Sequence, residues 1–226
     1  ASKYLANMGC LVEMGMSNGS KSTKEYYGHI AEMTVKCGAS MGVVLSEDGE
    51  SFVLIDHKGR ILDKDKQIAL TSLIILKSGI DKRLIVPHTA SRVIEGMAKC
   101  YDIEVVRTKN TPAAVMREMV QDKAGVEDSS FQYILNFDGI WGIGNLIDFM
   151  TANSVKLYEL VNELPHFHME KNEVKCDWQN KGRVIREIIE ENKNKELELF
   201  EGVRINNENG WVLILPDSER PVCNIY

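Results

Sequence analysis

Between residues 38 and 150 the sequence alternates short apolar runs with longer segments of helical character, and this alternation constrains the fold more than any other feature. Two apolar runs, Val43 to Leu45 and Phe52 to Ile55, flank the turn-prone Glu47-Asp48-Gly49 and predict a β-hairpin. The later strands are predicted at RLIVP, IEVVRT and FQYILNF, alternating with helices at 66–77, at 91–101 and from Thr111-Pro112 onward. Strands that alternate with helices of this length predict a layered, mostly parallel sheet. We therefore expect residues 38–150 to form one α/β domain.

The segments on either side follow a different order. Residues 1–20 hold a helix end, the short strand CLVEMGM and the loop SNGS, which are too little to form a core alone, and a helix is predicted at 24–37. Beyond residue 151 come a helix ending near Leu164, the strand-like HFHMEKNEVKCDW, the helical GRVIREIIEENK and a strand pair, ELELFEGVRI and GWVLIL. Residues 151–226 are thus predicted to be a small α+β domain. The chain starts without methionine, inside what reads as a helix, so we expect a fragment of a longer protein.

Composition excludes several classes of function. The 226 residues can bury a sizeable core. The net charge is −6 and the basic residues form no sustained run, so we expect no nucleic acid partner. No apolar run approaches the roughly 20 residues that span a bilayer, so no membrane partner is expected. The five cysteines are widely spaced and include no Cys-x-x-Cys pair, which indicates reduced thiols in a cytoplasmic protein.

Several stretches, taken in order, resemble the last two domains of the α-D-phosphohexomutases, the phosphomannomutase and phosphoglucomutase family. They are GVVLSEDGESFVLID, YDIEVVRTKNTPAAVM, and FEGVRI followed by GWVLILPDSERP. The mutase-like tail of some bacterial mannose-1-phosphate guanylyltransferases is resembled more closely still, by the forms VPHTASRVIEGMA, RTKNTPAAVM, FQYILNFDGIWGI and LPDSERP. The resemblance implies a layered mixed α/β sheet domain of phosphohexomutase type, followed by a small α+β domain. Residues 1–37 would then be a remnant of the preceding domain with a linking helix.

The resemblance places a former metal loop in the hairpin turn. Active mutases hold magnesium with three carboxylates at alternate positions of an Asp-Gly-Asp-Ala-Asp-Arg loop, whose counterpart here runs from Ser46 to Ser51. Asp48 and Glu50 are the remaining candidate metal ligands, because Ser46 replaces one carboxylate and Ser51 replaces the arginine. Mg²⁺ demands near-ideal octahedral geometry, so we expect this loop to bind it poorly, and a solvated turn is the competing interpretation.

The resemblance also places a phosphate loop at Leu215 to Pro221. The active form, Arg-Pro-Ser-Gly-Thr-Glu-Pro, grips the substrate phosphate, and Asn224 stands where a later arginine would be. Here both prolines are kept, and Ser218 and Arg220 are the candidate phosphate ligands. Asp217 and Glu219 add carboxylates, and like charges about 4 Å apart repel by roughly 1 to 4 kcal/mol. We interpret LPDSERP as a former phosphate loop kept for its shape, and a retained site that uses Arg220 as the alternative.

The remaining family positions are also altered. The sugar-contact segment would fall at AGVEDSS, where Glu127 and Ser129 are weak matches and loop residues are the competing interpretation. After Arg107-Thr108, the chain has Asn110 to Ala113 in place of a segment with a basic residue. The family's phosphoserine nucleophile would belong to a first domain outside these residues, so no catalytic residue and no firm cofactor is assigned.

Three hypotheses follow from the resemblance. In the first, the chain is a catalytically silent module, structural or regulatory, in a sugar-nucleotide enzyme of the guanylyltransferase type. In the second, it is part of a divergent phosphohexomutase that transfers a phosphoryl group within hexose phosphates. In the third, it senses a sugar phosphate without turnover. The expected partners are the N-terminal domains of the parent chain, a sugar phosphate ligand and further copies of the chain.

Overall fold

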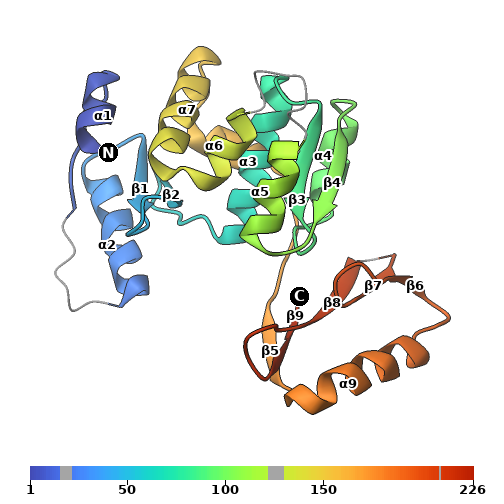
Figure 1. The fold of residues 1–226 in the computed structure, drawn as a ribbon. Coiled ribbons are helices and arrows are strands. Elements are labelled where there is room, and N and C mark those ends of the chain that lie inside the picture. The colour runs from blue at the N-terminus through green and yellow to red at the C-terminus, as the bar shows by residue number, and fades with distance from the viewer. Residues whose placement is uncertain (16–21, 122–129, 209) are drawn as a thin grey trace.

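The computed structural model describes residues 1–15, 22–121, 130–208 and 210–226 (Figure 1). The larger part of the chain contains twelve elements in the described residues: α1 (Ser2–Asn7), α2 (Thr23–Lys36), β1 (Met41–Leu45), β2 (Phe52–Asp56), α3 (Lys64–Ser78), β3 (Arg83–Pro87), α4 (Val93–Lys99), β4 (Glu104–Thr108), α5 (Pro112–Gln121), α6 (Ser130–Phe137), α7 (Gly139–Ala152) and α8 (Leu157–Glu163). The smaller part contains β5 (Asn172–Lys175), α9 (Trp178–Glu191), β6 (Glu196–Glu198), β7 (Val203–Asn207), β8 (Gly210–Pro216) and β9 (Val222–Ile225). The predicted mixed α/β class is confirmed.

Helix α3 is the centre of the main core. The side chain of its N-cap, Asp63, accepts a hydrogen bond from the backbone N–H of Lys66, and Gly79 ends the helix in the left-handed region at φ 65°. Every residue from Ala69 to Leu76 is buried, so this helix is covered on all sides, as expected for an element inside a core. Helices α4, α6 and α8 and strands β2 and β3 pack around it. This core therefore extends into α8, where Leu157 and Leu160 are fully buried.

The strands of the larger part form two separate pairs. The predicted hairpin is confirmed, because β1 and β2 pair antiparallel with Met41 opposite Asp56. Strands β3 and β4 pair parallel with Arg83 opposite Glu104. One layered, mostly parallel sheet was predicted here, and that detail is wrong for the described residues: the hairpin and the parallel pair belong to different sheets.

The predicted strand FQYILNF is helix α6, which explains why the parallel pair stops at β3. Gln132 of this helix is buried, and its Oε1 accepts a hydrogen bond of 2.7 Å from the backbone N–H of Ile85. Its Nε2 donates to the backbone oxygen of Arg83 at 3.3 Å. The helix thus satisfies backbone groups of β3 that a third strand would otherwise pair with. A short apolar run is equally compatible with a strand and with a buried helix, which is why periodicity failed here.

The smaller part is an antiparallel sheet in the order β5-β9-β8-β7-β6, with α9 packed on one face (Figure 1). The strand pair expected from ELELFEGVRI and GWVLIL is present as β7 and β8, with Val203 opposite Ile214. Of the strand-like HFHMEKNEVKCDW, only Asn172–Lys175 forms a strand. The division into 1–37, 38–150 and 151–226 stays a prediction. No helix within the described ranges has the length and apolar character needed to cross a membrane.

Candidate functional site

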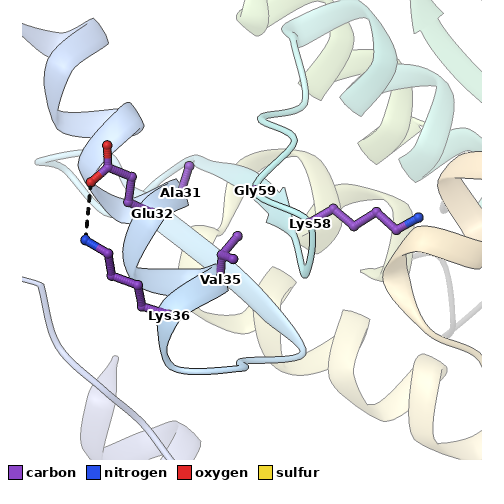
Figure 2. Close-up of a pocket in the computed structure, with 6 residues that line it drawn as sticks. All are labelled: Ala31, Glu32, Val35, Lys36, Lys58 and Gly59. Atoms are coloured by element: carbon purple, nitrogen blue, oxygen red, sulfur yellow. Dashed lines mark ion pairs between the residues drawn. The ribbon is translucent and has the colours of Figure 1, made fainter.

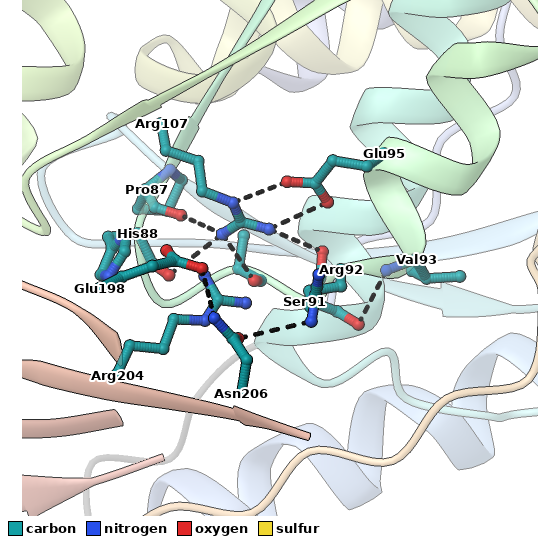
Figure 3. Close-up of polar contacts among 11 residues, drawn as sticks. Pro87, His88, Ser91, Arg92, Val93, Glu95, Arg107, Glu198, Arg204 and Asn206 are labelled. Carbon is teal, nitrogen blue, oxygen red and sulfur yellow. Dashed lines mark hydrogen bonds and ion pairs between the residues drawn. The ribbon is translucent and has the colours of Figure 1, made fainter. Parts of the chain in front are cut away.

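The two parts of the chain meet where β3 and β4 end, and Arg107 organises this junction (Figure 3). Its guanidinium donates to the backbone oxygens of the last residue of β3 and of the turn after it, over distances of 2.9 to 3.3 Å: Pro87, His88, Ala90 and Ser91. The same group binds both carboxylate oxygens of Glu95, at 2.7 and 3.0 Å. A planar fork with five donors suits this task, whereas an ammonium group lacks the geometry. Arg107 therefore fixes the shape of the turn that faces the C-terminal sheet.

Arg204 of β7 is the matching cation on the other side of the junction. It is 1% exposed, lies 4.2 Å from the Trp211 ring and is 3.9 Å from the Glu198 carboxylate. Burial and the nearby Arg107 lower the pKa of Arg204 to about 10, with Glu198 opposing, so the side chain keeps its charge at neutral pH. Burial, followed by Arg204 and Arg107, also lowers the pKa of His88. The junction thus places two arginines, each paired with a glutamate, beside a neutral histidine.

Polar contacts join the two parts directly. Arg92 donates to Asn206 at 3.4 Å, and the backbone N–H of Asn110 donates to the Glu201 carboxylate at 2.7 Å. The Asn110 side chain also accepts a hydrogen bond from Thr89 at 2.6 Å. Asn110 opens the segment that was predicted to have lost a basic substrate-binding residue. In this structure the segment anchors the C-terminal sheet.

The loop that follows β8 closes on the carboxylate of Asp217. Its Oδ1 accepts hydrogen bonds from the backbone N–H groups of Glu219 and Arg220, both at 2.9 Å. Its Oδ2 accepts from the Arg220 guanidinium at 2.9 Å and from Asn224 at 3.2 Å. Consecutive backbone N–H groups beside a guanidinium form the kind of concavity that binds anions. In this loop the group that accepts these hydrogen bonds is the loop's own carboxylate, that of Asp217.

Arg220 is engaged on its second edge as well. Its Nη1 and Nη2 donate to the two carboxylate oxygens of Glu173 on β5, at 3.0 and 2.8 Å. Both carboxylates raise the pKa of Arg220 above its usual range, Glu173 first. Arg220, one of the two predicted phosphate ligands, thus bridges the carboxylates of Asp217 and Glu173. The other, Ser218, is exposed in the loop.

Lys181 of α9 supports the loop from beneath. It is 8% exposed, and its Nζ donates to the backbone oxygens of Asp217 and Arg220, both at 2.5 Å. The ammonium also lies 3.6 Å from the centre of the Trp178 ring, which shields it from solvent. Sequence reasoning missed Lys181, because nothing in the helical pattern distinguishes it from a surface lysine.

We expect the Asp217 carboxyl to titrate far below an ordinary aspartate. The backbone N–H of Glu219 lowers its pKa, and Asn224 and Arg220 lower it further against the opposing effect of partial burial. Because the folded pKa lies below the unfolded value, about 3.9, the stabilisation is present above that pH. It is lost as the pH falls through the folded pKa. Carbon NMR shifts of the Asp217 carboxyl, followed during acid titration, measure this, and a midpoint at or above that of free aspartate contradicts it.

The hairpin turn between β1 and β2 is held by hydrogen bonds among its own residues. Asp48 accepts hydrogen bonds from the Ser46 hydroxyl and from the backbone N–H of Glu50, at 2.5 and 3.0 Å. The Ser46 hydroxyl also accepts a hydrogen bond from the backbone N–H of Ser51 at 2.9 Å, and it lies 3.0 Å from the backbone oxygen of Ser51. These bonds, that of Ser46 first, lower the pKa of Asp48. Among the residues that the structure describes, no three His, Cys, Asp or Glu side chains are placed to hold a metal ion. Asp48 and Glu50 therefore stay a prediction as metal ligands, and in this structure the carboxylate of Asp48 is occupied by bonds within the turn.

A shallow groove of about 310 Å³ lies between α2 and the turn after β2 (Figure 2). Glu32 and Lys36 on its rim form an ion pair of 3.6 Å, and Lys58 points away from them. Its remaining lining residues are Ala31, Val35 and Gly59. The polar groups of this groove do not converge on a ligand position. Glu127 and Ser129, the weak candidates for sugar contact, lie outside the described residues.

Comparison with known proteins gives the chain its relatives. No protein-family model matches it. It is 29% identical to the phosphoglucosamine mutase of Methanocaldococcus jannaschii over 214 residues, which cover 91% of this chain and 48% of that protein. It is 25% identical to a phosphoglucomutase/phosphomannomutase of Thermococcus kodakarensis, over 86% of this chain and 44% of that protein. The chain spans about half the length of the curated relatives it matches.

Solved structures agree on the fold. A phosphoglucomutase/phosphomannomutase family protein from Burkholderia thailandensis superposes with a TM-score of 0.73 at 17% identity, over 89% of this chain and 45% of that one. An N-acetylphosphoglucosamine mutase from Aspergillus fumigatus, solved with GlcNAc-6P and magnesium, superposes with a TM-score of 0.53 at 10% identity, over 82% of this chain and 44% of that one. The chain thus has the fold of phosphohexomutase domains, and its relatives belong to the α-D-phosphohexomutase superfamily.

Proposed function

We propose that this chain is a phosphohexomutase-like module without catalysis of its own, which serves a structural or regulatory role in a sugar-phosphate or sugar-nucleotide enzyme. The observation that carries the proposal is the carboxylate of Asp217, which accepts the hydrogen bonds that the loop after β8 would otherwise offer to a phosphate. We further propose that the parent protein is of the mannose-1-phosphate guanylyltransferase type, which the sequence forms VPHTASRVIEGMA and LPDSERP support.

Competition for one set of donors explains why a sugar phosphate would bind poorly. Two backbone N–H groups, the Arg220 guanidinium and Asn224 already donate to Asp217. An incoming phosphate must displace a carboxylate that is covalently attached and therefore present at high effective concentration. The second edge of Arg220 is held by Glu173, so the guanidinium cannot turn to the ligand without breaking a bidentate pair.

The contacts at the junction support a structural role. Arg107 fixes the turn after β3, and the bond from the backbone N–H of Asn110 to Glu201 ties the segment after β4 to the C-terminal sheet. The two parts of the chain are thus bonded to one another.

The second candidate function is that of a divergent phosphohexomutase, of which this chain is one half. The alignment with the phosphoglucosamine mutase of Methanocaldococcus jannaschii, which covers 91% of this chain, favours this second function. In this case the Asp217 loop would open for a sugar phosphate, and the nucleophile would come from a segment outside these residues.

Phosphate binding tests the loop directly. Isothermal titration with mannose 1-phosphate and glucosamine 1-phosphate should give no heat for the unmodified chain at millimolar ligand. Asp217→Ser empties the anion position and keeps the backbone donors, so we expect measurable binding of both sugar phosphates. Adding Leu215→Arg to that variant should strengthen the binding further, because it supplies a cation.

Glu219→Ser is the matched control for Asp217→Ser. It removes the same charge from the same loop, but the Glu219 side chain is exposed and its carboxylate does not occupy the anion position. If both variants gain equal affinity, net charge rather than occupancy excludes phosphate. Binding by the unmodified chain that disappears in Arg220→Ala would show a working phosphate site.

Catalysis is tested separately by a coupled mutase assay on the chain with Mg²⁺ and a hexose bisphosphate activator. We expect the product to form at the rate of the heat-inactivated control. Turnover above that rate contradicts a silent module and favours the divergent phosphohexomutase.

A further inference from the structure

His88 is buried at the junction between the two parts of the chain. It follows β3 in the turn that Arg107 holds, and it is 2% exposed. Its ring lies 5.5 Å from the ring of Phe200, which belongs to the C-terminal part, so that part helps to cover the imidazole. Among the residues that the structure describes, neither ring nitrogen of His88 has a hydrogen-bond partner. An imidazole buried in this way is far more stable in its neutral form, because a buried charge needs a partner.

Charged side chains of the described residues face the junction, and none of them bonds the His88 ring. They are three arginines and three glutamates, from β4, β6, β7, α4 and the residues next to them: Arg92, Arg107, Arg204, Glu95, Glu198 and Glu201. Figure 3 shows all of them except Glu201. The three carboxylates already accept hydrogen bonds from the Arg107 guanidinium, from the Asn206 side chain at 2.6 Å, and from the backbone N–H of Asn110. A proton on His88 would therefore add a buried cation near Arg107 and Arg204, with none of these carboxylates bonded to it.

The two parts are joined by a short link and by polar bonds that opening would break. Residues 164–171, which form neither helix nor strand, connect α8 to β5. Arg92 donates to Asn206 at 3.4 Å, and the backbone N–H of Asn110 donates to Glu201 at 2.7 Å. If the C-terminal sheet moves away from β3 and β4, these bonds break and Phe200 leaves the His88 ring. The imidazole then meets water, where its pKa is the ordinary value of about 6.5.

We propose that His88 is a pH-sensitive switch: its neutral form keeps the junction closed, and its protonation moves the C-terminal sheet away from the turn after β3. Burial, followed by Arg204 and Arg107, lowers the pKa of His88 in the closed junction, with Glu198 opposing. Because the closed pKa lies below the open value, the closed state is favoured in full above about pH 6.5 and loses stability as the pH falls below it. The loss stops at the closed pKa, below which both states are protonated. From about pH 7.5 to about pH 5 the equilibrium constant for opening should rise by up to about 30-fold, a limit set by the open pKa.

Hydrogen exchange at the backbone N–H of Asn110 measures the opening, because this group loses its Glu201 acceptor when the junction opens. NMR of the full chain at the two pH values, with rates corrected for intrinsic exchange, should show protection that falls severalfold, by up to that factor. His88→Leu replaces the imidazole with an apolar side chain of similar size, so protection should then be equal at both pH values. His166→Leu is the matched control, since His166 is exposed in the link between the parts, and it should keep the full fall.

Titration of the imidazoles tests the switch without relying on the folding of His88→Leu. In the unmodified chain, carbon NMR shifts should give His88 a lower midpoint than the exposed His166 and His168. Arg204→Met removes a neighbouring cation, so the His88 midpoint should rise and the fall in Asn110 protection should shrink. The proposal is overturned if His88 titrates together with the exposed histidines, or if Asn110 protection in the unmodified chain does not depend on pH. Full pH dependence in His88→Leu would also overturn it, because another group would then drive the opening.

Discussion

Replacing Arg107 with methionine should lower the free energy of unfolding by about 3 kcal/mol, the cost of breaking a largely buried ion pair by removing one partner. The Arg107 side chain is 15% exposed, and its loss leaves Glu95 without its cation. It also leaves the backbone oxygens of His88 and Ala90 without their donor. Urea denaturation measures the change.

Arg107→Lys separates charge from geometry in this prediction. A lysine keeps the cation but cannot bond Glu95 in a bidentate way while reaching the turn, so we expect it to recover only part of the lost stability. If lysine restores the stability of the unmodified chain in full, the fork geometry of Arg107 is not what holds the junction.

The second large effect is expected for Gly202→Ala. Gly202 has φ 70°, and an added Cβ would lie 2.2 Å from the backbone oxygen of Ile214. A backbone atom cannot turn aside as a flexible side chain can, so β7 and β8 would have to separate at their first pair. Left-handed strain alone costs about 1 to 2 kcal/mol, and the clash should bring the total loss to about 3 kcal/mol or more.

Gly182→Ala is the control for Gly202→Ala. Gly182 lies inside α9, and a Cβ there meets no atom within 4 Å. Alanine is the better helix former, so the same substitution should here raise the free energy of unfolding by about 0.5 to 1 kcal/mol. Thermal and urea unfolding should show a lower free energy of unfolding for Gly202→Ala and a higher one for Gly182→Ala. A mild effect at Gly202 would show that the β7–β8 corner relaxes easily.

The strands and helices that depend on local signals could be predicted from the sequence. The β-branched runs RLIVP and IEVVRT form β3 and β4, and the helix predicted at 66–77 is α3 with its Asp63 cap. FQYILNF failed because its seven residues suit a strand or a buried helix equally well. What decides between them is the bond of Gln132 to β3, between residues 47 positions apart. Local pattern does not contain that information.

The LPDSERP loop shows the same division between local and distant information. The sequence predicted that LPDSERP keeps its turn and that its new carboxylates oppose phosphate, but it treated Asp217 and Glu219 alike. In the structure Asp217 takes up the donors of the loop, while Glu219 lies exposed. Glu173 and Lys181 complete the arrangement from β5 and α9. These partners come from elements at least 36 positions away, so no motif could indicate them.

The strand order β5-β9-β8-β7-β6 has a consequence for vectorial synthesis on the ribosome. Strand β9 follows all the other strands in the chain, yet it lies between β5 and β8. Strand β5 therefore emerges with no neighbour to pair with, and it waits while α9 and three further strands are made, at about 5 to 20 residues per second. Its unpaired edge and the Glu173 carboxylate, which later binds Arg220, stay open to solvent and chaperones during that interval. A stop codon ahead of Val222 would remove β9, the strand with which β5 pairs. Chains that end there are therefore expected to be degraded rather than to fold.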